Sequence, residues 1–209
     1  MGIPAHVSGF RVFDYHTEAA NTAIVEYIDP VDGERLALIN LAYTAAATAH
    51  VASLMYAGGV GGTGSRNVAS ALALSGQKVI NVTNTPLDPA GNAAAASDVI
   101  AFELTDGSWE WDTIASVATK AITCTNNITG VDAAAGGTAI AAGAKVMILG
   151  VVGDAVSQQI SLPATTLTEY GKGELTLVHP YFGEPWMLSI TNATNAGFLW
   201  NALFGHINK

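Results

Sequence analysis

Apolar and polar residues alternate with a period of two along most of the 209-residue chain. The stretch NTAIVEYIDPVDGERLALINLAY (21–43) predicts two strands, because Asp29, Pro30 and Gly33 supply turn residues between two apolar runs. Alternation of this kind turns one side of each strand toward a core and the other toward solvent. The pattern predicts an all-β protein with over a third of its residues in strands, and with helix content below about 15%.

The segment SDVIAFELTDGSWEWDTIASV (97–117) predicts a hairpin. Asp106 and Gly107 favour a two-residue type I′ turn. Counting outward from that turn pairs Leu104 with Trp109 and Phe102 with Trp111. The buried face is then expected to carry Phe102, Leu104, Trp109 and Trp111, and the opposite face Glu103, Glu110 and Asp112.

Short strands with Gly, Pro and Asn between them predict a β-sandwich, a jelly roll or a small barrel. Residues 88–98 and 129–144 are expected to form long Ala/Gly-rich loops. The first twenty residues lack clear alternation, so we expect an extended N-terminal arm over 1–20 and a single β-rich domain over 21–209. Helix signals are weak: residues 65–75 and 41–54 could form short helices, and the second segment fits a strand equally well.

Composition excludes several classes of partner. The net charge is −9, and the eight Lys and Arg residues are scattered, whereas binding to nucleic acid needs a basic face. The apolar stretch 136–156 is interrupted by Lys145 and several glycines, so we expect no membrane span, and no signal peptide is recognisable. Cys124 is the single cysteine and is expected to be a buried, inert thiol.

The hexapeptide GVGGTG, from Gly59 to Gly64, matches G-x-G-x-x-G. A dinucleotide site also needs a strand before the glycines, a helix after them and an acidic residue about 20 residues on. Val82, Thr83 and Asn84 stand at that last place, and further strands follow. We therefore expect no nicotinamide or flavin cofactor, although an NAD-dependent oxidoreductase stays a remote alternative.

Other candidate sites are weaker. Glu103 and Glu110, if they face each other, could act as acid and base in glycoside hydrolysis or bind calcium. A solvated hairpin face is the alternative, and we favour it. The five histidines show no metal-ligand spacing. We expect no catalytic residue, no metal site and no enzymatic activity.

The C-terminal run from Phe198 to Phe204 is apolar on both faces. A strand covered on both faces lies either in the middle of a sandwich or at a subunit contact. Only 12% of residues are charged, which is consistent with a surface partly covered by partner subunits, or with solvation by Ala, Gly, Thr and Asn. As candidate subunit or capsid contacts we select Phe10, Phe13, Tyr15, Phe198, Trp200 and Phe204.

Four segments carry a resemblance to a known group: TAAATAHVASLM (44–55), SGQKVINVTNTP (75–86), ASDVIAFELTDGSWEWDTIASVAT (96–119) and GEPWMLSITNATNAGFLWNALFGHI (183–207). In texture they resemble the head proteins of tailed bacteriophages that decorate, or cement, the capsid. The resemblance implies a β-rich, non-enzymatic virion protein, made in the host cytoplasm, that binds the outer surface of the major capsid protein lattice and bridges capsomers, often as a homotrimer. The glycine segment would then be a pliable loop against a neighbouring subunit. A tail or fibre module that binds host glycans is the alternative.

Overall fold

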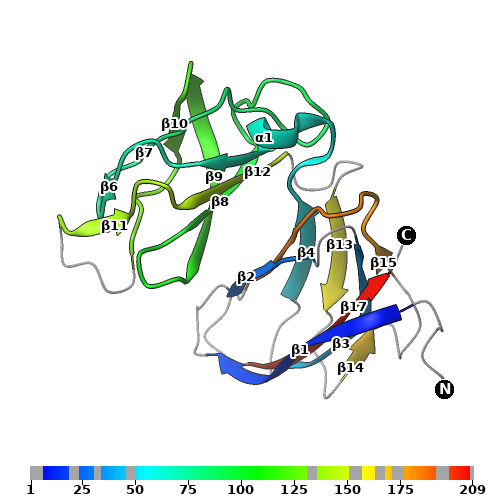
Figure 1. The fold of residues 1–209 in the computed structure, drawn as a ribbon. Helices are drawn as coiled ribbons and strands as arrows, with labels where there is room; N and C mark the ends of the chain where they lie inside the picture. The colour runs from blue at the N-terminus through cyan, green and yellow to red at the C-terminus, as the bar shows by residue number, and fades with distance from the viewer. Residues whose placement is uncertain are drawn as a thin grey trace. The chain divides into compact units, whose positions relative to one another are not determined.

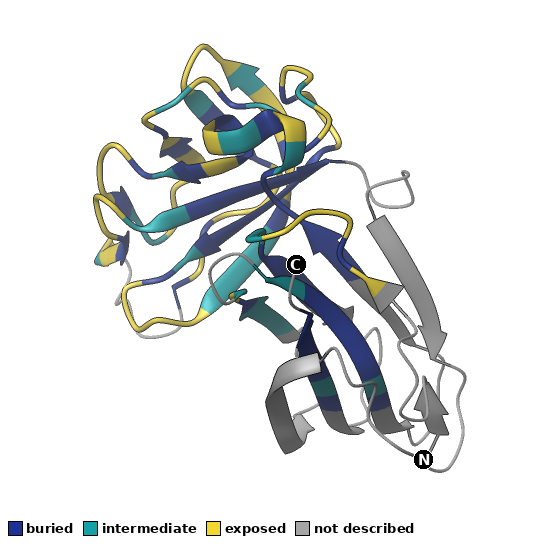
Figure 2. Cartoon of the chain, turned by 45° about the vertical axis from the view of Figure 1, so that its right-hand side comes forward, coloured by how far each residue is buried: buried dark blue, intermediate teal, exposed yellow. Residues whose placement is uncertain are grey.

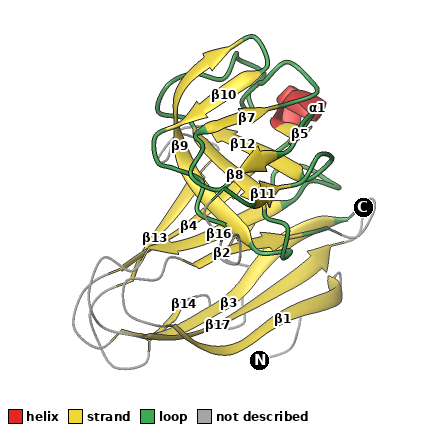
Figure 3. Cartoon of the chain, turned by 90° about the vertical axis from the view of Figure 1, so that its left-hand side faces the viewer, coloured by secondary structure: helices red, strands yellow, loops and turns green. Residues whose placement is uncertain are grey.

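The structure is a computed structural model that describes residues 7–18, 24–30, 34–45, 50–130, 136–150, 157–162, 168–170, 177–191 and 198–207. More than a third of the chain lies in the strands that the structure describes, so the all-β prediction is confirmed. Within the described ranges the helical residues form one 3₁₀ turn, η1 (Gly59–Gly61), and one four-residue helix, α1 (Gly62–Ser65) (Figure 3). Neither is long and apolar enough to cross a membrane.

The chain divides into two compact units (Figure 1). The first comprises Met1–Ile24, Ile28–Leu54 and Gln159–Lys209, and the second comprises Val25–Tyr27 and Met55–Gln158. The sequence led us to expect one domain over 21–209 preceded by an arm. Within that expected arm, residues 7–18 form a strand that pairs with the C-terminal strand.

The first unit is built around nine strands in two sheets. They are β1 (Val7–Glu18), β2 (Ile24–Ile28), β3 (Arg35–Ala45), β4 (His50–Tyr56), β13 (Ser157–Leu162), β14 (Thr168–Tyr170), β15 (Leu177–Val178), β16 (Trp186–Thr191) and β17 (Phe198–Ile207). Residues 25–27 of β2, 55–56 of β4 and 157–158 of β13 are grouped with the second unit. One sheet has the order β1-β17-β3-β14, with β15 also on β3, and the other has the order β13-β4-β16-β2.

This strand order is that of a jelly roll. The pairs are β1 with β17, β2 with β16, β3 with β14 and β15, and β4 with β13. Each strand of the first half thus pairs with the strand at the matching place, counted from the C-terminus, in the second half. Such pairing describes one long antiparallel ribbon. Rolling the ribbon up adds the pairs β17–β3 and β16–β4 and gives two facing sheets. Trp186 on β16 meets Phe204 on β17, with ring centroids 6.1 Å apart, so the core lies between the sheets.

The apolar C-terminal strand is an interior strand. β17 pairs with β1 on one edge and with β3 on the other, from Phe198 opposite Ala45 to Ile207 opposite Arg35. Its neighbour β3 is buried over Leu36–Ile39 without alternation, as expected where both faces are covered. β17 is therefore central in its sheet, and its residues from Ala202 to Ile207 are buried except for the partly buried Leu203. A subunit contact at this strand stays a prediction.

The second unit is a small barrel. Its strands are β5 (Arg66–Val68), β6 (Ala73–Leu74), β7 (Val79–Asn81), β8 (Val99–Glu103), β9 (Trp109–Ala118), β10 (Ala121–Cys124), β11 (Thr138–Ile140) and β12 (Lys145–Gly150). Six of them form a sheet in the order β5-β12-β8-β9-β10-β7. The two edges then meet, because Ser70 N–H donates to the Asn81 carbonyl (2.7 Å) and Thr83 N–H donates to the Val68 carbonyl (3.0 Å). Closure of this kind removes the exposed sheet edges.

The barrel interior is a continuous apolar core. Buried residues of the barrel lie along β8 and β12 and alternate with exposed ones on β9, while the connecting loops are largely exposed (Figure 2). The largest side chain in this core is Phe102, which is fully buried. The core also contains Ile80, Ile100, Leu104, Ile114, Ile122, Ile128, Ile140, Val146 and Ile148.

The predicted hairpin forms, but its register is shifted by one residue. Leu104 N–H donates to the Ser108 carbonyl and Gly107 N–H donates to the Leu104 carbonyl, which defines a three-residue loop. Gly107 has a positive φ of 85°, and Asp106 is not among the residues with positive φ. This is a type I turn followed by a left-handed glycine, not the predicted type I′ turn. Asp106 accepts hydrogen bonds from Ser108, which lower the pKa of its carboxyl.

The extra loop residue exchanges the faces of β9 relative to β8. Phe102 lies opposite Glu110, and Glu103 lies opposite Trp109. The core face therefore carries Phe102 and Leu104 but not the tryptophans, and Trp109 and Trp111 are only partly buried. The predicted buried face was wrong for both tryptophans, because a register slip of one residue moves every side chain of a strand to its other face.

The two helix predictions also fail. Residues 65–75 contain the end of α1 and the strands β5 and β6, and residues 41–54 contain the end of β3 and most of β4. In the second segment the alternative strand interpretation is confirmed for the described residues. Tertiary pairing has overridden the weak helical preference of both segments.

The corrected register predicts an order of stabilities. Phe102→Ala should lower the free energy of unfolding by about 3–5 kcal/mol, because a fully buried ring is removed from the barrel core. Trp111→Ala should cost clearly less, since its ring is only partly buried. Urea unfolding of both variants measures this order, and a larger loss for Trp111→Ala would restore the two-residue turn.

Candidate functional site

The glycine-rich segment lacks the helix that a dinucleotide site requires. Its six residues, 59–64, fall in η1 and the four-residue helix α1. The strand β5 follows directly at Arg66. The strand–glycine–helix arrangement that would point a helix terminus at a pyrophosphate is therefore not formed here.

The glycines allow close packing against the chain's own loop 85–89. A Cβ atom on Gly61 would lie 2.1 Å from the Asp88 carbonyl oxygen, and one on Gly64 would lie 2.7 Å from the Thr85 carbonyl oxygen. Gly61 N–H donates to the Pro89 carbonyl, and the Gly64 carbonyl accepts from Leu87 N–H. The expectation of a pliable loop was wrong, because the segment is clamped onto 85–89.

Two buried polar side chains complete this clamp. Ser65 Oγ accepts from Gly58 N–H (3.0 Å) and donates to the Ile148 carbonyl (2.6 Å). The Asn67 amide donates to the Gly64 carbonyl (3.3 Å) and exchanges hydrogen bonds with the backbone of Asn84. Asn84, near the place where a ribose-binding acid would stand, thus fixes the glycine segment. Sequence reasoning did not identify Ser65 or Asn67.

The three hairpin carboxylates do not form a pair. The corrected register separates Glu103 from Glu110 across the hairpin. The Glu103 carboxylate accepts from Lys145 N–H (3.3 Å), whereas Glu110 accepts from the backbone (3.1 Å) and hydroxyl (2.9 Å) of Thr129. The acid–base or calcium interpretation of facing carboxylates was wrong, and these groups act as acceptors for loop backbone.

Asp112 is the most buried of the three, at 7% exposure. It accepts from Asn126 N–H (2.7 Å) and from the Asn126 amide (2.8 Å), which compensates the burial of its charge. Glu110 and Asp112 together fasten residues 126–130 to β9. Across the described ranges, His, Cys, Asp and Glu side chains do not gather in groups of three or more that could hold a metal ion.

Cys124 lies beside this network and is buried, as predicted. Burial raises the pKa of its thiol to about 12, and the carboxylates of Asp112 and Glu110 contribute in the same direction. A thiol with so high a pKa stays protonated at neutral pH. Because the thiolate is the reactive form, the side chain is a poor nucleophile.

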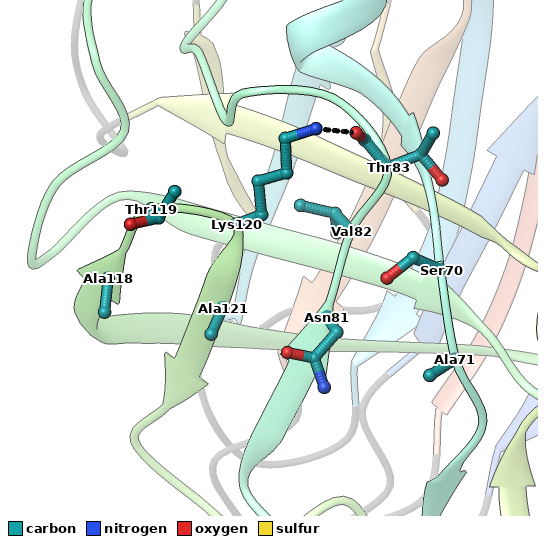
Figure 4. Close-up of a pocket in the computed structure, with 9 residues that line it drawn as sticks. All are labelled: Ser70, Ala71, Asn81, Val82, Thr83, Ala118, Thr119, Lys120 and Ala121. Atoms are coloured by element: carbon teal, nitrogen blue, oxygen red, sulfur yellow. Dashed lines mark hydrogen bonds between the residues drawn. The ribbon is translucent and has the colours of Figure 1, made fainter.

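A shallow groove of about 550 Å³ crosses the closure of the barrel (Figure 4). Its walls consist mainly of small and polar side chains, namely Ser70, Ala71, Asn81, Val82, Thr83, Ala118, Thr119, Lys120 and Ala121. The Lys120 ammonium donates to the Thr83 carbonyl (2.6 Å) across the groove. Thr119 has a positive φ of 56° at the turn between β9 and β10. The groove therefore presents methyl, hydroxyl and amide groups. The ammonium group of Lys120, the one cationic residue that lines it, is already bonded to the Thr83 carbonyl.

A second cluster lies in the first unit around the loop of residues 178–185. The His179 side chain is fully buried and its ring centroid lies 5.2 Å from that of Trp186. Its Nδ1 accepts from Tyr181 N–H (3.1 Å), and its Nε2 lies 3.3 Å from the Pro185 carbonyl oxygen. Burial lowers the pKa of His179 to about 4, so the imidazole is neutral at pH 7.

The predicted contact residues divide into two sets. The structure describes the backbone of Phe10, Phe13, Tyr15, Phe198 and Trp200, but their side chains lie outside the described residues. Phe204 is fully buried against Trp186 inside its own unit. The proposed contact role of all six stays a prediction. Among the residues whose burial the structure describes, the exposed large apolar side chains are Val60, Leu72, Val79, Val178, Tyr181 and Phe182.

The sequence of this chain matches neither a family model nor a curated protein.

The structural similarities are weak. "VP17, a capsid protein of bacteriophage P23-77" is 13% identical over 96% of this chain and 97% of its own, with a TM-score of 0.21. The "VP16-VP17 complex, a complex of the two major capsid proteins of bacteriophage P23-77" is also 13% identical, covers 96% of this chain and 100% of its own, and has a TM-score of 0.22. TM-scores this low establish neither a shared fold nor a shared function.

The glycine clamp predicts a loss of stability in Gly61→Ala. The added methyl group would overlap the Asp88 carbonyl, so we expect a cost of about 1–3 kcal/mol in the free energy of unfolding. Thr63→Ala, at an exposed neighbouring position, is the matched control and should be near neutral. Titration calorimetry that shows micromolar NAD or FAD binding, lost in Gly61→Ala, would instead restore the dinucleotide site.

The carboxylate network predicts that Asp112→Ala costs about 2–3 kcal/mol, because two donors of Asn126 lose a charged acceptor in a buried place. Glu103→Ala removes a single longer hydrogen bond and serves as the control, with a smaller loss. Thermal unfolding of the two variants tests this. Equal losses would show that Asp112 is not the anchor of residues 126–130.

Proposed function

We propose that this chain is a structural protein of a phage particle, which binds the outer surface of the major capsid protein lattice and bridges neighbouring capsomers. The observation that carries the proposal is the strand pairing of the first unit, which is that of a jelly roll. Jelly rolls occur in viral capsid proteins, and also in lectins and cupins. The fold is consistent with a capsid protein, and the composition and the surface of the chain favour this class over the others.

Composition and surface support the same proposal. Half of the residues are hydrophobic and 12% are charged. In the first unit, Val178, Tyr181 and Phe182 lie close together in the chain, and each is 37% exposed. Apolar side chains that are grouped on a surface mark protein contacts more often than scattered ones do. The loop that carries them is our candidate docking surface for the lattice.

The proposed stabilisation of the capsid depends on the surface area that the chain buries against its neighbours. A stable contact between two proteins buries about 1,200–2,000 Å² of surface. A subunit that makes such contacts with two neighbouring capsomers adds their free energy to the work needed to separate the capsomers. We expect a homotrimer, so that one assembled unit holds several capsomers.

A second candidate is that the jelly-roll unit builds the lattice itself. The complete pairing of its ribbon favours this, because a jelly roll can tile a shell without help from another fold. Glycan binding has less support in the barrel. The groove there is lined by small side chains without an aromatic ring on which a sugar could stack.

Oligomeric state and capsid binding are measured on the purified chain. Light scattering should give a mass above that of one chain, with three chains expected. Cosedimentation with undecorated capsids should deplete the protein from the supernatant. A monomer that ignores capsids would contradict the proposal, and shells formed by the chain alone would favour the second candidate.

The docking surface is tested by a matched pair of variants. Phe182→Asp places a charge on the exposed loop of the first unit and should weaken cosedimentation at least about tenfold, which corresponds to 1.4 kcal/mol. Leu72→Asp places the same charge at an exposed position of the barrel and should bind as the parent chain does. Circular dichroism checks that both variants fold. Loss of binding in Leu72→Asp alone would place the docking surface on the barrel.

A truncation separates the N-terminal prediction from the fold. Residues 7–18 pair with β17, so their removal would expose a long strand edge. Removal of residues 1–6 alone leaves β1 in place. If the N-terminus reaches a neighbouring subunit, this short deletion should weaken capsid binding without changing the circular dichroism spectrum, and unchanged binding would contradict the arm.

A further inference from the structure

We propose that the loop of residues 178–185 is an acid-sensitive latch, closed by neutral His179 and released when that imidazole binds a second proton. The proposal does not depend on the proposed function. It rests on the positions of both ring nitrogens and on the place of this side chain at the centre of the loop's attachment.

Both nitrogens of His179 are engaged in one tautomer. Nδ1 faces Tyr181 N–H, a donor, so it must carry the lone pair. Nε2 faces the Pro185 carbonyl, an acceptor, so it carries the hydrogen. A proton added at Nδ1 would point at the Tyr181 N–H and abolish that hydrogen bond. Neutral His179, the second residue of the loop, therefore holds both Tyr181 and Pro185, the last residue.

Two backbone hydrogen bonds also attach the loop, and the Arg35 guanidinium packs on the Phe182 ring. His179 N–H donates to the Leu36 carbonyl (2.8 Å), and Gly183 N–H donates to the Glu34 carbonyl (2.7 Å). Between these two points stand Tyr181 and Phe182, each 37% exposed. The imidazole joins Tyr181 to Pro185, the two ends of the segment that carries the exposed aromatic rings.

Burial opposes the protonation of His179 most strongly, and the neighbouring charge of Arg35 opposes it further. From β3, Arg35 adds a positive charge near the imidazole, while its guanidinium lies 4.6 Å from the centre of the Phe182 ring. Beside the loop, Glu34 faces His206 on β17 at 3.6 Å. Glu184 and Tyr181 are the other titratable groups of the loop. Trp186 of β16 contributes an uncharged ring against the imidazole.

The direction of the effect follows from linkage. The folded-state pKa of His179, about 4, is below the ordinary value of 6.5. An opened loop takes up the proton over that interval and the closed loop does not, so the closed state loses stability as pH falls from 6.5 toward 4. Between pH 7 and pH 5 the opening equilibrium should rise about 20-fold.

Hydrogen exchange at the Tyr181 amide reads the latch directly. After correction for intrinsic exchange, its protection should fall about 20-fold from pH 7 to pH 5. Amides of β3 and β17 should keep their protection, which separates local opening from global unfolding. If Tyr181 and the strand amides lose protection together, or if neither changes, the latch is excluded.

A matched pair of variants assigns the effect. In His179→Asn, the side-chain oxygen can still accept from the amide two residues on, but the group does not titrate, so the pH dependence at Tyr181 should disappear. His206→Asn removes the neighbouring imidazole and should keep the pH dependence. The reverse result would transfer the switch to the pair of His206 and Glu34. Should His179→Asn not fold, titration of the His179 ring resonances decides, since an apparent pKa near 6.5 would overturn the proposal.

Discussion

In both units, a strand from the first part of the chain pairs with a strand from the last part. In the first unit, β4 pairs with β13, although more than a hundred residues separate them. In the barrel, β5 pairs with β12. These are the first and the last strands, in chain order, of its six-stranded sheet. The barrel is inserted into the jelly roll between β4 and β13. Because β4 and β13 pair with each other, the insertion leaves the strand pairing of the jelly roll intact. The loop-closure entropy of so long an insertion rises only with the logarithm of its length.

Within the barrel, closure and core depend on each other. The hydrogen bonds between residues 68–70 and 81–83 join the sheet edges, and this encloses Phe102 and its apolar neighbours. The clamped glycine segment fastens one loop region through Ser65 and Asn67, and the carboxylates of Glu110 and Asp112 fasten another. These polar side chains thus replace backbone partners that a small barrel cannot supply in its loops.

Much of the fold was accessible from the sequence, because strand periodicity is a local property. The all-β class was predicted correctly. The sandwich, the jelly roll and the small barrel were alternatives for a single domain, whereas the strand pairing of the first unit is that of a jelly roll and the second unit closes as a small barrel. The register of the hairpin was not accessible, since Asp106 and Gly107 fit loops of two or three residues equally well. The insertion was hidden for a different reason: only long-range pairing distinguishes a strand of one unit from a strand of the other.

The structure of the candidate sites is set by long-range contacts. Gly59 to Gly64 match a motif, but whether a helix follows is decided by the pairing of β5 with β12 and by contacts to Asp88. The buried state of His179 could not be inferred either, because its partners lie on the backbone of its own loop and on β3. Only Cys124, whose burial follows from strand alternation, was placed correctly.

The central claim is that the chain is a structural part of a capsid surface. Electron cryomicroscopy of capsids, imaged with and without the added protein, tests it most directly. The account predicts extra density on the outer surface, across the boundary between neighbouring capsomers, into which the jelly-roll unit fits. Capsids that show no added density at saturating protein, or density only in the interior, would contradict it.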